Sequence, residues 1–124
     1  MRLLPILLIL GGCAVPTPPS SGGAELSREL AGRVAGPAQQ CIRASSDTRS
    51  LQALERRSLV YRDGRTLWVN RLSEGCPGFH PTDTLIVEIH GSEYCRNDLV
   101  RSLPQASGIP GPACRLGDFV PYRR

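Results

Sequence analysis

The sequence lacks a hydrophobic run long enough to cross a membrane. Its longest apolar stretch, Leu3–Leu10, has eight residues and is interrupted by Pro5, whereas a membrane-spanning helix needs roughly twenty. A short apolar run after Arg2 is typical instead of a cleaved secretory signal. We therefore expect an exported protein whose first twelve residues, 1–12, are a signal peptide.

Lysine is also absent, since all fifteen basic residues are arginines. This reflects either the codon bias of a GC-rich genome or a need for bidentate contacts with anions. Without Arg2 the formal net charge of +4 falls to about +3, and the arginines are scattered among acids, with only Arg56-Arg57 and Arg123-Arg124 adjacent. Nucleic-acid binding would need a concentrated basic face with interleaved aromatics, so no nucleic-acid partner is expected.

Catalytic motifs are missing as well. There is no Cys-x-x-Cys for thiol redox chemistry and no Gly-x-Ser-x-Gly nucleophile elbow. Residue types suited to a triad or to paired-carboxylate hydrolysis do occur, at Ser92, His90 and Asp98 and at Asp83, Glu88, Glu93 and Asp98. Scattered acids are common on any soluble surface, so we expect no enzyme and assign no catalytic residue.

The segment Leu10-Gly11-Gly12-Cys13 resembles a bacterial lipobox, in which small residues precede a cysteine that is lipidated and becomes the N-terminus. Two alternatives stay open: an ordinary signal cleaved near Gly12 or Ala14, or a buried N-terminal segment. Lipidation of Cys13 would anchor the protein in the envelope of a Gram-negative bacterium. By analogy with the sorting of such proteins, Ala14 favours the outer membrane, facing the periplasm.

The residues after Cys13 support this assignment. Residues 13–23 are rich in Pro, Ser and Gly, a composition that gives an extended, flexible tether. Four cysteines remain for the single domain at 24–124, and an even number is typical of disulfides in an oxidising compartment. Of the three possible pairings we favour Cys41–Cys114, joining the ends of the domain, with Cys76–Cys95 closing the middle.

A metal site is the alternative use of these cysteines. Cys76-x3-His80-x9-His90-x4-Cys95 supplies two thiols and two imidazoles, a ligand set that zinc accepts. The spacing fits no standard zinc finger, and exported thiols are normally oxidised. We therefore expect no cofactor, and keep a periplasmic metal-binding or hydrolytic protein that uses His80, His90 and nearby acids or cysteines as the second hypothesis.

The remaining pattern predicts a mainly β fold, bordering on α+β. Leu26, Leu30 and Val34 have helical spacing, so a helix is expected over 24–35, ended by Gly36-Pro37. It packs on the domain or, less in keeping with its narrow apolar face, lies on the membrane.

Strands are expected at 58–62, 65–72, 85–90, 99–103 and 119–122, with Leu51 and Leu54 in a preceding strand. Asp63-Gly64 predicts a hairpin with a type I′ turn, and Pro121 places the last strand at an edge. The fold is expected to be a small barrel-like or curled antiparallel sheet of about five short strands, stapled by disulfides.

One family resemblance carries further expectations. It is borne by Cys41-Ile42, Tyr61, Trp68-Val69-Asn70-Arg71-Leu72, Cys76-Pro77-Gly78-Phe79, Cys95-x-x-Asp98 and Gly111-x-x-Cys114-x-Leu116-Gly117-x-Phe119-x-Pro121. This order is similar to a family of small proteobacterial envelope proteins classified only as a domain of unknown function. The resemblance covers about residues 36–122 and implies location and paired cysteines, but no activity. The function expected is a non-catalytic binding or structural module, tethered to membrane lipid through Cys13, whose partner is another envelope protein or a peptide added to the sheet edge or to the loop at 104–113.

Overall fold

The computed structural model describes residue 12 and residues 23–44 and 51–124. The predicted signal, apart from Gly12, and the predicted lipidation site Cys13 with the tether up to residue 22 lie outside these residues. Within them the chain forms α1 (Ala24–Leu30), β1 (Val34–Ala35), β2 (Cys41–Arg43), β3 (Gln52–Glu55), β4 (Ser58–Asp63), β5 (Thr66–Arg71), β6 (Thr84–Glu88), β7 (Glu93–Cys95), β8 (Leu99–Leu103), β9 (Cys114–Arg115) and β10 (Phe119–Arg123). None of the helices in these ranges is long and apolar enough to cross a membrane.

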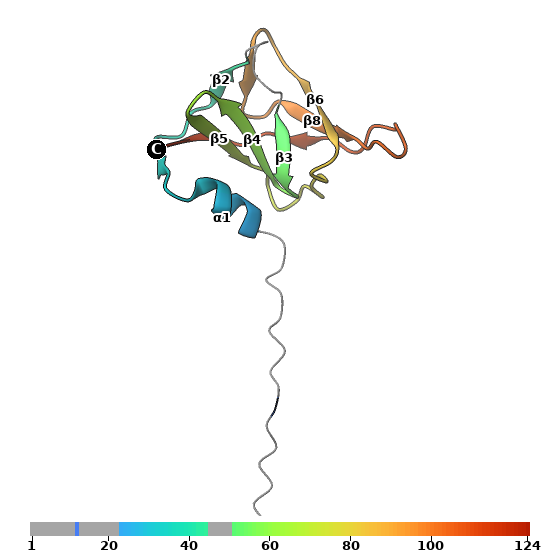
Figure 1. Cartoon of the computed structure of the whole chain (residues 1–124). Helices are drawn as coiled ribbons and strands as arrows, with labels where there is room; N and C mark the ends of the chain where they lie inside the picture. Colours follow the sequence, from blue (N-terminus) through green and yellow to red (C-terminus); the bar gives the residue numbers. More distant parts are fainter. Residues whose placement is uncertain (1–11, 13–22, 45–50) are drawn as a thin grey trace, which may run out of the picture.

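The mainly β, disulfide-bonded fold with one short helix is confirmed, but its strands do not close into a barrel. The ten strands of the described ranges form three antiparallel sheets, with the orders β1-β10-β5-β4-β3, β6-β8-β9 and β2-β7. The prediction of about five strands therefore matches only the largest sheet. In Figure 1, α1 lies along one side of this sheet, away from β6 and β8.

The central strands β4 and β5 are apolar on both faces because both faces are covered. On one face, Leu59, Tyr61 and Trp68 belong to the main core with Phe119. On the other face, Val60, Leu67 and Val69 pack with Leu26 of α1 in a second cluster. Strands buried on both faces lose the alternation of apolar and polar residues, which explains the unbroken apolar runs here.

The predicted hairpin is present, with Asp63 opposite Thr66. The two-residue loop is Gly64-Arg65, and Gly64 alone of the two has a positive φ, of 56°. This is the arrangement of a type II′ turn, with glycine first, rather than the type I′ turn that was predicted. Both turn types match the twist of the strands, so the hairpin forms with either one.

The predicted helix is shorter than its apolar spacing indicated. It ends at Leu30, and Gly32 follows with a φ of 74°, a conformation that favours glycine and turns the chain. Val34 consequently lies in β1 with a relative exposure of 74%, instead of on the buried stripe of the helix.

Strand β10 is an inner strand of the five-stranded sheet, not the edge strand predicted from Pro121. It lies between β1 and β5. The carbonyl of Pro121 accepts a hydrogen bond of 2.7 Å from Gly36 N, so this residue turns its backbone groups away from β5. Proline has no N–H, and at this position an N–H would point to the β1 side, beyond the end of β1. The β5–β10 ladder therefore loses no hydrogen bond.

The disulfides are Cys41–Cys95 and Cys76–Cys114, so the favoured pairing was wrong. Cys41 lies directly opposite Cys95 in the β2–β7 ladder. The two ends of the domain are joined instead by β1 and β10, where Val34 pairs with Arg123. Backbone hydrogen bonds thus fulfil the role for which we had assigned a disulfide.

Candidate functional site

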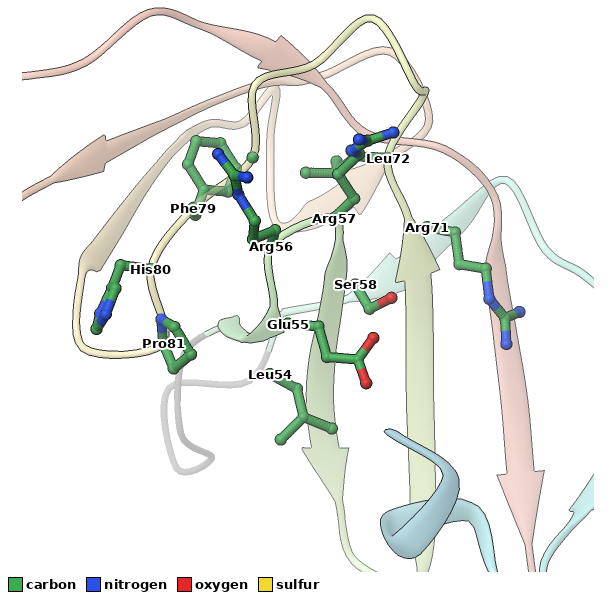
Figure 2. A pocket seen from close by; sticks show the side chains of 11 residues that line it. Leu54, Glu55, Arg56, Arg57, Ser58, Arg71, Leu72, Phe79, His80 and Pro81 are labelled. Carbon is green, nitrogen blue, oxygen red and sulfur yellow. The ribbon is translucent and has the colours of Figure 1, made fainter. Parts of the chain in front are cut away.

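An open groove of about 910 Å³ lies at the end of the large sheet where β3 turns into β4. The Arg56-Arg57 turn forms one rim, and the segment 78–81 approaches it from the side, as Figure 2 shows. The lining residues share a basic or apolar character with few exceptions: Leu54, Glu55, Arg56, Arg57, Ser58, Arg71, Leu72, Gly78, Phe79, His80 and Pro81.

Backbone hydrogen bonds hold the Arg56-Arg57 turn in place. Leu72 N donates to Arg57 O at 2.8 Å, and Phe79 N donates to Arg56 O at 2.7 Å. Only glycine fits at position 78, because a Cβ there would lie 2.4 Å from Arg56 O and φ is 86°. The turn is therefore rigid while both arginine side chains are exposed to solvent, an arrangement that presents two guanidinium groups from a fixed base.

A β-bulge directs Glu55 toward the helix. Ala53 pairs with Leu59 but Glu55 pairs with Ser58, so β3 carries one extra residue, Leu54. A bulge of this kind places neighbouring side chains on the same face, and Leu54 accordingly packs with the helix-side cluster. No residue pattern around β3 predicts the bulge.

Glu55 performs the capping that the start of α1 lacks. The N-cap residue is Gly23, which has no side chain to offer. Glu55 Oε1 accepts hydrogen bonds from Gly23 N at 2.8 Å and from Leu26 N at 2.9 Å, which satisfies backbone donors that a helix start leaves without partners. Gly23, the last residue of the predicted tether, is thereby fixed to the rim of the groove.

The groove has an excess of positive charge. Arg56, Arg57 and Arg71 are exposed, and the only acid among the lining residues is Glu55, with one oxygen committed to the helix. Guanidinium groups bind phosphates and carboxylates through paired hydrogen bonds. The arrangement is therefore suited to an anion.

The positive charge extends over the whole helix side of the molecule. The part formed by α1 and the five-stranded sheet, residues 23–35, 51–72 and 119–124, contains nine arginines and four acids. Residues 36–44 and 73–118 contain four arginines and six acids. The part that α1 and the five-stranded sheet form therefore carries the excess of arginines, whereas the remainder has an excess of acids.

At the far end of α1 a smaller hollow of about 340 Å³ is lined by Arg33, Arg65 and Arg124. Its arginines are partly committed, since Arg33 Nη1 donates to Arg65 O at 2.9 Å. Nearby, both oxygens of Glu29 accept from Arg62, at 3.0 and 3.1 Å. The Arg62 hydrogen bond holds the pKa of Glu29 below its usual 4.5, so this acid stays ionised and fastens α1 to β4.

No protein-family model, curated protein or solved structure matches the chain. The resemblance to the envelope family accordingly stays a prediction.

The proposed metal ligands are not brought together. Cys76 and Cys95 are bonded to Cys114 and Cys41 rather than available as thiolates. His80 Nδ1 lies 2.7 Å from Thr82 Oγ1 at the groove, and His90 contacts Asp98. In the described ranges the one group of three potential ligands is Cys41, Glu93 and Cys95, two of which form the disulfide.

The residues considered for a triad are only partly assembled. His90 Nδ1 lies 3.5 Å from Asp98 Oδ1, but the histidine side chain is 89% exposed. Asp98 also accepts from Cys95 N at 2.8 Å, as the turn cap that its sequence position suggested. Of the acids considered for hydrolysis, Asp83 accepts from His80 N at 3.0 Å and Glu88 lies 3.8 Å from Arg101, which are contacts that stabilise turns and strands.

Glu55→Ala is expected to lower the free energy of unfolding by about 1–2 kcal/mol, because two backbone donors at the start of α1 lose their acceptor. Urea unfolding measures this change, and faster amide exchange of Leu26 would locate it at the helix. Glu74→Ala, an exposed acid in a turn, serves as the control and should stay within about 0.5 kcal/mol. Equal effects of the two substitutions would contradict the capping role.

Proposed function

We propose that the protein is a lipid-anchored module of the bacterial envelope that binds a ligand or partner without catalysing a reaction. The mature chain begins at Cys13, which carries the lipid, and faces the periplasm from the outer membrane. The lipobox-like segment before Cys13 is the observation that carries this proposal. Export is supported by the pairing of the four other cysteines in disulfides, because such bonds persist in oxidising compartments.

The position of α1 is compatible with a tether. Ten residue steps separate Cys13 from Gly23, which allows a reach of at most about 35 Å. Gly23 is bonded to Glu55, so the tether would enter the domain beside the basic groove. The groove is consequently our candidate for the binding site of this module.

Palmitate labelling in the native host tests the anchor. The wild-type chain is expected to incorporate label and to fractionate with the outer membrane, whereas Cys13→Ser should show no label and leave the membrane fraction. Cys41→Ser/Cys95→Ser is the matched control, since it removes cysteines but keeps the lipidation site. Equal labelling of the wild type and Cys13→Ser, or no labelling of either, would refute the lipoprotein assignment.

A further inference from the structure

We propose that the basic groove binds the phosphate of anionic lipid headgroups, so that the domain lies on the membrane with its helix side down. The inference rests on the proposed lipid anchor, which brings the groove to the bilayer. The occupant we assign is therefore a lipid of the surface to which the chain is tethered, rather than a soluble anion or a peptide.

The first argument is the distance between the groove and the tether. Glu55 lines the groove and binds Gly23 N and Leu26 N at 2.8 and 2.9 Å. Arg56 and Arg57 are the next two residues of the chain, in a turn held rigid by Leu72 and Phe79. A lipid anchor at Cys13 would hold these arginines close to the headgroups, at a distance no greater than the length of the tether.

The second argument is the chemistry of the groove. Arg56 and Arg57 offer planar donors that match phosphate oxygens, and apolar side chains, among them those of Leu54 and Pro81, line the same groove. A headgroup attached to glycerol and acyl chains has the same combination of an anionic and an apolar part. Figure 2 shows the guanidinium groups of Arg56 and Arg57 on the same side of the turn.

The third argument is the polarity of the whole domain. The helix side has nine arginines against four acids, and the remainder has four against six. A negatively charged surface attracts the first side and repels the second. The excess of positive charge therefore lies in the same part of the domain that the tether enters.

Vesicle binding of the unlipidated mature chain, residues 13–124 with Cys13→Ser, tests the groove without the anchor. All described helices and strands lie between residues 24 and 123. We expect binding to phosphatidylcholine vesicles that contain phosphatidylglycerol, and little binding to pure phosphatidylcholine. Since each arginine near an anionic surface contributes about a fivefold gain in affinity, Arg56→Gln/Arg57→Gln should weaken binding about thirtyfold.

The control is Arg96→Gln/Arg101→Gln, which removes the same charge from the acidic part of the molecule and should change affinity by less than about threefold. Equal losses in the two double variants, or no preference for phosphatidylglycerol, would overturn the proposal. So would release by inorganic phosphate but not by sodium chloride of equal ionic strength, because the ligand would then be the free anion. Palmitate labelling is independent of all these results, so a failed anchor and a failed groove can be distinguished.

Discussion

Replacing Cys76 and Cys114 together with alanine is expected to lower the free energy of unfolding by about 4 kcal/mol. The disulfide closes a loop between residues that are 38 positions apart, and a cross-link of that span reduces the entropy of the unfolded chain by an amount equivalent to about 4 kcal/mol. Both sulfurs are also buried in the main core. Urea unfolding of the oxidised double variant, compared with the wild type, measures the loss.

Thiol titration of paired variants tests the connectivity itself. In the unlipidated chain with Cys13→Ser, Cys76→Ala/Cys114→Ala should contain no free thiol, because Cys41 and Cys95 still pair. Cys76→Ala/Cys95→Ala should contain two additional thiols, since each substitution removes half of a different bond. The opposite outcome would restore Cys41–Cys114 and Cys76–Cys95.

The pairing of the cysteines could not be predicted from the sequence, because it depends on which strands become neighbours. Cys41 and Cys95 are 54 positions apart, yet they face each other across the β2–β7 ladder. Nothing in the residues around Cys41 specifies that ladder. The number of cysteines available for disulfides was predictable from composition, whereas their partners follow from non-local strand pairing.

Local signals were more reliable where one turn decides the structure. Gly64 between two β-rich runs was sufficient to predict the β4–β5 hairpin, because two-residue loops with glycine at a positive φ match the strand twist. The end of the helix was predicted too late because Gly36-Pro37 was favoured over Gly32. The helical spacing of apolar residues includes Val34, although the chain has already turned at Gly32.

The groove was not predicted because its parts are distant in sequence. The Arg56-Arg57 turn, Arg71 and the segment at 78–81 come together only through the contacts of Leu72 and Phe79 with the turn. His80 was singled out for its imidazole, and the structure instead places it at the rim of a basic site. The adjacent pair Arg56-Arg57 was the one local indication of a basic site. The small net charge of the chain gave no reason to single it out.

Asn70→Leu is expected to lower the free energy of unfolding by about 3 kcal/mol, an unusually large effect for the exchange of one polar side chain. Asn70 is 0% exposed. Its Nδ2 donates to Gly117 O, and its Oδ1 accepts from Gly117 N, both at 2.8 Å. Leucine has the same branched skeleton but no hydrogen-bonding atoms, so the cost arises mainly from two backbone groups left without partners, at about 1–3 kcal/mol each.

The position of this pair in the sheet explains why an amide is needed. Phe119 is the first residue of β10 to face β5, opposite Asn70, and Gly117 lies two positions before it. The side chain of Asn70 thus continues the ladder where the connection from β9 has not yet become a strand. A Cβ on residue 117 would lie 2.6 Å from Arg71 O.

Asn70→Asp keeps the acceptor for Gly117 N but sets a carboxylate against Gly117 O. It should therefore also destabilise the protein at neutral pH, and recover part of the loss in acid, where the protonated group can donate. Gln52→Leu, an exposed polar residue of β3, is the control. A loss below about 0.5 kcal/mol for Asn70→Leu, measured by urea unfolding, would mean that water replaces the amide and that Asn70 does not hold the connection in place.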